Sequence, residues 1–185
     1  LAYTGYLAGH ETIAETVADP VFAAYVRRLW SEIIPAVQAP DGVSLTEYAD
    51  ALFDRYANPG IRHKTWQIAM DGSQKLPQRI LGSLAANLSA GRDSPALCLA
   101  VAAWMRYVGG MDELGQVIDV RDPLAGRLRD ASDSADTPEG KVAALLDVRD
   151  VFSAELAEKL IRPVTKAAIQ LWTKGTRAAI EEGAL

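Results

Sequence analysis

The chain is organised around Ala96-Leu-Cys-Leu-Ala-Val-Ala-Ala-Trp-Met-Arg-Tyr-Val108, a stretch in which Arg106 is the only charged residue. A segment that is apolar almost all round is typical of a helix buried on every side. Ser94-Pro95 marks its start, because proline in the first turn has no N–H to lose there. Gly109-Gly110 marks its end. We therefore predict a central buried helix over 96–108.

Capping residues stand directly before proline at several other points. The pairs are Asp19-Pro20, Asn58-Pro59, Ser94-Pro95, Asp122-Pro123 and Thr137-Pro138. An oxygen of the first residue can accept hydrogen bonds from the free N–H groups of a first helical turn. Ser44-Leu-Thr-Glu47 reads as a capping box. These signals predict helix starts, whereas Pro35 and Pro163 are expected to kink or end their helices.

Apolar residues recur at intervals of three and four over 45–56 and 76–88, and further helices are predicted over 142–146, 156–161 and 164–180. The only β-like run is Val117-Ile-Asp-Val120, and one strand cannot form a sheet. The predicted fold class is an all-α bundle of roughly eight helices.

Composition narrows the class of protein. Hydrophobic residues make up 49% of the 185 residues and charged residues 23%, which indicates one globular domain over 1–185. A net charge of −5 argues against a nucleic-acid binder. No apolar run reaches the roughly 20 residues that cross a bilayer, so no membrane partner is predicted. The single cysteine, Cys98, lies in the apolar run and is expected to be a core residue of a cytoplasmic protein.

Sequence motifs for cofactors and metals are absent. There is no Gly-x-Gly-x-x-Gly turn after a strand, no Walker loop and no Cys/His spacing for a metal. We therefore predict no cofactor-binding residue and no metal ligand in this chain.

One segment, 62–79, carries a net charge of +3 inside this acidic chain. Its charged residues are Arg62, Lys64, Asp71, Lys75 and Arg79, and His63 lies among them. Gly72 and Ser73 interrupt the helical pattern, and Ser73 can cap the helix that follows. Lys75 would then lie in a first turn, where the helix dipole disfavours a cation unless an anion or polar ligand compensates. The alternative is an ordinary solvated basic face.

Three segments carry a resemblance to a known family. They are RYANPGIRHKTWQIAMDGSQKLPQRIL (55–81), AYTGYLAGHETIAETVADPVF (2–22) and DVRDPLAGRL (119–128). Together they resemble the C-terminal domain of the mannitol dehydrogenase family, the polyol-specific long-chain dehydrogenases. The string HKTWQIAMDGSQKLPQR (63–79) resembles the fructuronate reductase, or mannonate oxidoreductase, branch more than the mannitol 2-dehydrogenases.

The resemblance implies a helical substrate-binding domain similar to the C-terminal domain of 6-phosphogluconate dehydrogenase-like enzymes. It also implies an NAD-binding Rossmann domain that comes first in the full chain, lies outside 1–185 and faces this domain across the substrate cleft. The family's proton-transferring lysine lies in a Lys-x4-Asn-x2-His motif just before the segment that matches Leu1. No catalytic residue is therefore expected here, and the fragment alone is expected to be inactive.

The same resemblance implies site residues. Lys75 matches a family lysine that contacts substrate, and Gln67 falls where mannitol-type members carry a substrate-contacting arginine. This departure shifts the expected substrate away from polyols. A hexuronate carboxylate would be well served by Arg62, Lys64 or Lys75, because charge-assisted hydrogen bonds are the strong ones. With His63 from the same basic segment, these five residues are the predicted substrate-binding set.

The expected activity is hydride transfer between NAD(H) and a sugar acid or polyol, such as mannonate and fructuronate. Two alternatives stay open. A mannitol 2-dehydrogenase-type polyol dehydrogenase would turn over neutral polyols and would be indifferent to loss of Arg62 or Lys64. A non-enzymatic helical ligand-binding module would have no Rossmann domain before Leu1.

Overall fold

The computed structural model describes residues 1–184, and every regular element within this range is a helix or a helical turn. The elements are α1 (Ala2–Leu7), α2 (Ile13–Ala18), α3 (Pro20–Ile33), the 3₁₀ turn η1 (Ile34–Ala36), α4 (Leu45–Ala57), α5 (Thr65–Ala69), α6 (Gly72–Leu76), the π-helical turn η2 (Pro77–Leu81), α7 (Gly82–Ser89), α8 (Pro95–Val108), α9 (Ala125–Asp133), α10 (Pro138–Leu146), α11 (Ala154–Lys174) and α12 (Thr176–Gly183). Extended pairing is limited to two isolated bridges, Thr12–Lys64 and Met111–Val117. The predicted all-α class is confirmed, although the helices are shorter and more numerous than expected.

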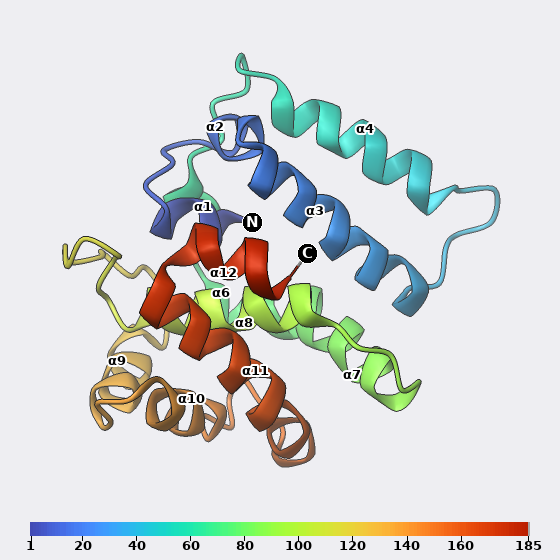
Figure 1. Ribbon diagram of the computed structural model, residues 1–185. Coiled ribbons are helices and arrows are strands. Elements are labelled where there is room, and N and C mark those ends of the chain that lie inside the picture. Colours follow the sequence, from blue (N-terminus) through green and yellow to red (C-terminus); the bar gives the residue numbers. More distant parts are fainter. Residues whose placement is uncertain (185) are drawn as a thin grey trace.

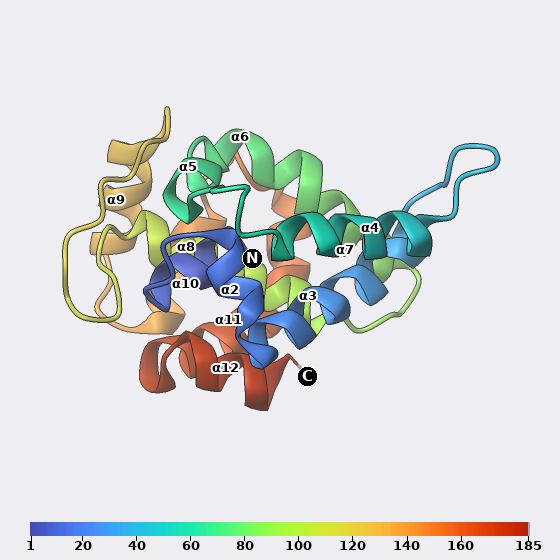
Figure 2. The ribbon, with the colours of Figure 1, turned by 90° about the horizontal axis from the view of Figure 1, so that it is seen from above.

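Helix α8 lies at the centre of the fold, as its sequence predicts. Its residues are buried except for Pro95 and Arg106, which are half-buried, and Trp104 and Tyr107 are among the largest enclosed side chains. Helices α11, α1, α12 and α3 pack against it (Figures 1 and 2). Burial on every side explains why this stretch tolerates almost no polar residue.

A buried carboxylate, not the predicted serine, caps the start of α8. Glu32 accepts hydrogen bonds from the backbone N–H groups of Ala96 (3.1 Å) and Leu97 (2.9 Å). Ser94 occupies the capping position, but its hydroxyl instead accepts a hydrogen bond from Asn87 Nδ2 (2.8 Å). The prediction that Ser94-Pro95 starts the helix is right, and the cap comes from a residue of α3.

Three of the other predicted capping residues accept a backbone hydrogen bond, although at Ser44 this is only one half of the predicted capping box. Asp19 accepts from Val21 N, Thr137 from Gly140 N and Ser44 from Glu47 N, at 2.9, 3.1 and 3.3 Å. The prediction of a helix after Asn58-Pro59 is wrong. Asn58 ends α4, and its side-chain oxygen accepts from Gly60 N (2.9 Å), which closes a turn instead.

The two proline predictions have different outcomes. Pro35 lies in η1, directly after α3 ends, as expected. Pro163 neither ends nor divides its helix, because α11 runs continuously from Ala154 to Lys174. Buried side chains on both sides of Pro163, among them Leu160 and Val164, hold the helix against the core and compensate for the missing hydrogen bond. The predicted helix over 164–180 is divided at Gly175 instead, where φ is +85°.

Helices α3 and α4 form one side of the molecule and are joined by aromatic contacts. Trp30 of α3 lies 6.3 Å from both Phe53 and Tyr56 of α4, measured between ring centroids, and stacks on Tyr56. Residues of α4, α5 and α6 line a common cavity with residues of α3. This arrangement leaves space between α3, α4 and α6, and the candidate site lies there.

None of the helices described within 1–184 combines the length and the hydropathy needed to cross a membrane.

Candidate functional site

The junction between α5 and α6 has an unusual backbone. Asp71 adopts φ 55° and ψ 35°, the left-handed region, and no other non-glycine residue within 1–184 has a positive φ. Gly72 follows, and a Cβ atom there would lie 2.5 Å from both Trp104 Nε1 and the Tyr3 hydroxyl oxygen. Only glycine fits between these two side chains. Glycine at position 72 is therefore a steric requirement of this tight turn.

A distant segment holds the turn in place. Arg121 accepts a backbone hydrogen bond from Asp71 N (2.9 Å). Asp122 accepts from the backbone N–H of Ser73 (2.7 Å) and from its hydroxyl (2.6 Å). The Arg121 guanidinium also stacks over the Trp66 ring at 4.7 Å. The predicted role of Ser73 as a helix cap is wrong, because Ser73 lies inside α6 and its hydroxyl bonds to Asp122.

Lys75 is anchored by the end of α5. Its ammonium group donates a hydrogen bond of 2.6 Å to the Met70 carbonyl and lies 3.5 Å from the Ile68 carbonyl. These carbonyls are at the C-terminal end of α5, where acceptors are free and the helix dipole favours a cation. Lys75 is the fourth of the five residues of α6 and lies in its last turn, not in a first turn capped by Ser73 as predicted. The carbonyls at the end of α5 compensate its charge there.

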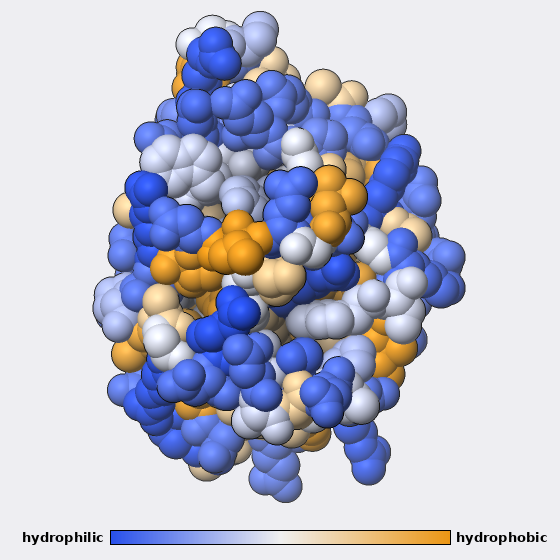
Figure 3. Space-filling model, turned by 90° about the vertical axis from the view of Figure 1, so that its left-hand side faces the viewer, coloured by the Kyte–Doolittle hydropathy of each residue, from blue (hydrophilic) through white to orange (hydrophobic). Residues whose placement is uncertain are grey.

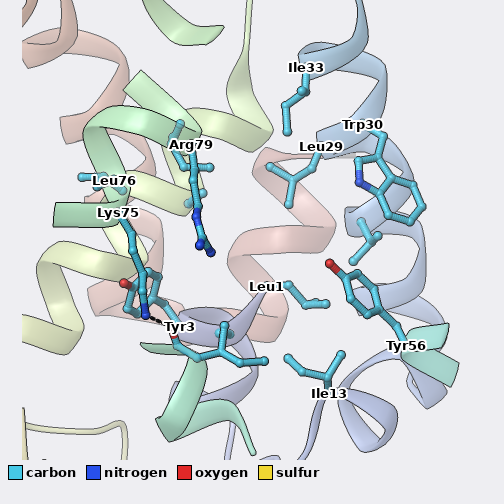
Figure 4. A pocket seen from close by; sticks show the side chains of 15 residues that line it. Leu1, Tyr3, Ile13, Leu29, Trp30, Ile33, Tyr56, Lys75, Leu76 and Arg79 are labelled. Atoms are coloured by element: carbon cyan, nitrogen blue, oxygen red, sulfur yellow. Dashed lines mark hydrogen bonds between the residues drawn. The ribbon is translucent and has the colours of Figure 1, made fainter. Parts of the chain in front are cut away.

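Lys75 lines a partly open cavity of about 290 Å³, to which α1, α2, α3, α4, α5, α6, η2 and α8 all contribute residues (Figure 4). The lining is mostly apolar. Its apolar residues are Leu1, Ala2, Ile13, Val26, Leu29, Trp30, Ile33, Ile68, Leu76, Ile80 and Ala100. The other lining residues are Tyr3, Tyr56, Lys75 and Arg79, and the Arg79 guanidinium points into the space (Figure 4). A cavity of this kind, apolar with a few polar groups, is typical of a small-molecule site.

Of the five predicted site residues, the structure places Lys75 alone in the cavity wall. Lys64 forms an ion pair with Glu11 (2.8 Å). Arg62, His63 and Gln67 are exposed and do not line the cavity. The structure therefore does not bring these four residues together with Lys75. Their contact with substrate stays a prediction.

Sequence reasoning missed Arg79 and Tyr56 as cavity residues. Arg79 was visible as part of the basic segment, four residues after Lys75 and so on the same helical face. Tyr56 reaches the cavity from α4, and nothing local in the sequence indicates that contact.

Cys98 is buried in α8, as predicted, and burial raises the pKa of its thiol to about 12. We expect iodoacetamide to label it at pH 8 roughly three orders of magnitude more slowly in the native protein than in urea, because only the thiolate reacts. Mass spectrometry of timed aliquots measures both rates. Comparable rates would contradict the buried placement.

Within 1–184, no group of three His, Cys, Asp or Glu side chains is placed to hold a metal ion.

These features define an all-helical domain with two cations in the lining of a largely apolar cavity. The chain belongs to the mannitol dehydrogenase C-terminal domain family, because the model of that family matches residues 1–172. The family predicted from the Asp-Gly-Ser-Gln-Lys segment is thereby confirmed.

Individual relatives agree with this assignment. The chain is 42% identical over 183 residues to D-mannonate oxidoreductase of Escherichia coli (strain K12). The matched region covers 97% of this chain and 37% of that protein. It is 43% identical, with the same coverage, to the uncharacterized oxidoreductase YeiQ of the same organism. A solved structure of Pseudomonas fluorescens mannitol 2-dehydrogenase, a ternary complex with NAD and D-mannitol, superimposes with a TM-score of 0.89 at 27% identity, covering 98% of this chain and 37% of that one. The chain thus spans about 37% of the length of these relatives.

Proposed function

We propose that residues 1–185 form the substrate-binding domain of an NAD-dependent oxidoreductase that interconverts a sugar acid or polyol and its keto form. The observation that carries this proposal is Lys75, which lines the cavity and whose ammonium group is fixed on the carbonyls at the end of α5. An ammonium group has three N–H donors, so Lys75 keeps a donor for a substrate oxygen beyond those used by the carbonyls. The oxidoreductase names of the relatives favour an enzyme over a non-enzymatic helical module.

The rest of the full-length protein would bind NAD. Residues 1–184 contain no sheet and therefore no glycine-rich turn between a strand and a helix that could hold the pyrophosphate. Bound NAD supplies the hydride chemistry. The residues of this chain would hold the substrate in register. Their apolar walls would exclude water and so strengthen each polar contact to the substrate.

The catalytic base and the partner domain belong to the same proposal. Leu1 and Ala2 line the cavity, so a segment joined to Leu1 in the full-length protein would leave from the cavity wall. A proton-transferring lysine in that segment would be close to the substrate. We place the enzyme in the cytoplasm, since the one cysteine of residues 1–185 is buried and unpaired in the described structure.

Turnover by the full-length protein tests the function. We expect NADH oxidation with fructuronate or tagaturonate to be faster than with fructose, because two cations without an acidic partner face the cavity. Absorbance at 340 nm gives the rates. Residues 1–185 alone serve as the control and are expected to be inactive. Full-length protein that oxidises NADH with none of the three compounds would overturn the proposal.

A neutral-polyol activity is the second candidate. The relative solved with D-mannitol favours it, since its fold matches this chain closely. It predicts that fructose is reduced at least as fast as either hexuronate, so the same assay separates the two candidates.

A further inference from the structure

Two cations share the cavity without an acidic partner. Lys75 and Arg79 are four residues apart in the continuous helical stretch from α6 into η2, and like charges at this spacing repel each other. None of the ion pairs formed within residues 1–184 includes either residue. The cavity lining contains no aspartate or glutamate. No acidic side chain of the lining therefore competes with an anion that enters the cavity from outside the domain.

The backbone at Arg79 is shaped by a proline. Pro77 has no N–H and cannot donate to the Ser73 carbonyl, so the regular helix is interrupted and the chain passes through the π-helical turn η2 (Pro77–Leu81). Single π-helical turns inside helices are frequent at functional sites. Arg79 lies in the middle of this turn, and its guanidinium points toward the centre of the cavity (Figure 4).

The two cations are not equally available. Lys75 already donates to the carbonyls of Met70 and Ile68. Arg79 lines the cavity, is exposed to solvent, and makes no side-chain hydrogen bond or ion pair within the described part of the chain. Its planar fork of N–H donors matches the two oxygens of a carboxylate. Lys75 is a point charge that suits hydroxyl or carbonyl oxygens along the substrate chain.

We propose that Arg79 binds the carboxylate of the substrate and so makes this site specific for a sugar acid over the neutral polyol or ketose of the same chain length. This inference rests on the proposed function and names its substrate class. Tyr56 lies across the cavity from Arg79, and its hydroxyl points into the space (Figure 4). Burial raises the pKa of Tyr56, so its hydroxyl stays protonated and can donate a second contact to the acid.

The inference is tested on the full-length enzyme with Arg79→Gln and Arg79→Lys. Fructuronate and fructose are the matched substrates, because fructose carries a hydroxymethyl group where fructuronate carries the carboxylate. We expect Arg79→Gln to lower kcat/KM for fructuronate roughly 100-fold, mainly through KM, and to change that for fructose less than about threefold. Arg79→Lys keeps the charge but loses the fork, so an intermediate loss is expected. Arg162→Gln, an exposed arginine of α11 outside this cavity, is the matched control.

A binding measurement separates this inference from the proposed function. Titration calorimetry with mannonate and mannitol compares the wild type with Arg79→Gln, without turnover. If the wild type binds mannonate and Arg79→Gln does not, the inference is supported. If the same enzyme transfers no hydride, only the proposed function is overturned. Equal losses for fructuronate and fructose, or mannonate binding that is unchanged in the variant or absent in the wild type, would overturn the inference.

Discussion

Replacing Lys75 with methionine is expected to lower kcat/KM of the full-length enzyme for its sugar substrate by roughly 100- to 1,000-fold. Methionine keeps most of the length of the side chain and removes the charge. A charge-assisted hydrogen bond to the substrate is then lost inside a cavity with mostly apolar walls, where such a bond is strong. The Met70 carbonyl also loses its donor, so the α5–α6 junction becomes less well fixed.

Steady-state kinetics of Lys75→Met with the best substrate provide the measurement. Lys159→Met is the control, because Lys159 lies on the exposed side of α11 and pairs only with Glu155. The control should retain wild-type kinetics. Lys75→Arg should keep part of the activity, since it restores a cation at the same place. A Lys75→Met enzyme with unchanged kcat/KM would show that the substrate does not reach this cavity.

The fold could be predicted from the sequence where the signal is local. The stretch 96–108 predicts a buried helix because its residues are apolar on all sides, and the structure confirms this. The caps at Asp19 and Thr137 are likewise local, because each side chain accepts a hydrogen bond from a backbone N–H group of the helical turn that follows it. Pro163 was misjudged because its helix is held by side chains packed on distant elements, which no local pattern reveals.

The site could be predicted only in part. Lys75 was identified from a motif and its expected position in a first helical turn, and the structure places it in the cavity wall. The neighbouring cations Arg62 and Lys64 were grouped with it by sequence proximity. Helix α5 and the left-handed Asp71 separate them from the cavity wall. The hydrogen bonds from Ser73 to the Asp122 carboxylate join segments far apart in the sequence, so only the structure reveals them.

A second large effect is expected on stability. Glu32→Ala should lower the free energy of unfolding of residues 1–185 by about 3 kcal/mol. The Glu32 carboxylate is 4% exposed and pairs with Arg28 (3.0 Å) while it accepts from the first N–H groups of α8. Removing it leaves those N–H groups buried without an acceptor and removes a negative charge from the positive end of the central helix. Urea unfolding followed by circular dichroism measures the loss.

Two further variants separate capping from the general effect of deleting a glutamate. Glu32→Gln keeps one carbonyl oxygen for α8 but presents an NH₂ group to the other N–H, so a smaller loss of about 2 kcal/mol is expected. Glu158→Ala removes an exposed carboxylate of α11 and should change stability by less than about 0.5 kcal/mol. If Glu32→Ala were as stable as Glu158→Ala, the start of α8 would not depend on α3. Because α3 also lines the cavity, Glu32 together with the hydrogen bond from the Tyr25 hydroxyl to the Ala96 carbonyl attaches the wall that carries Trp30 to the central helix.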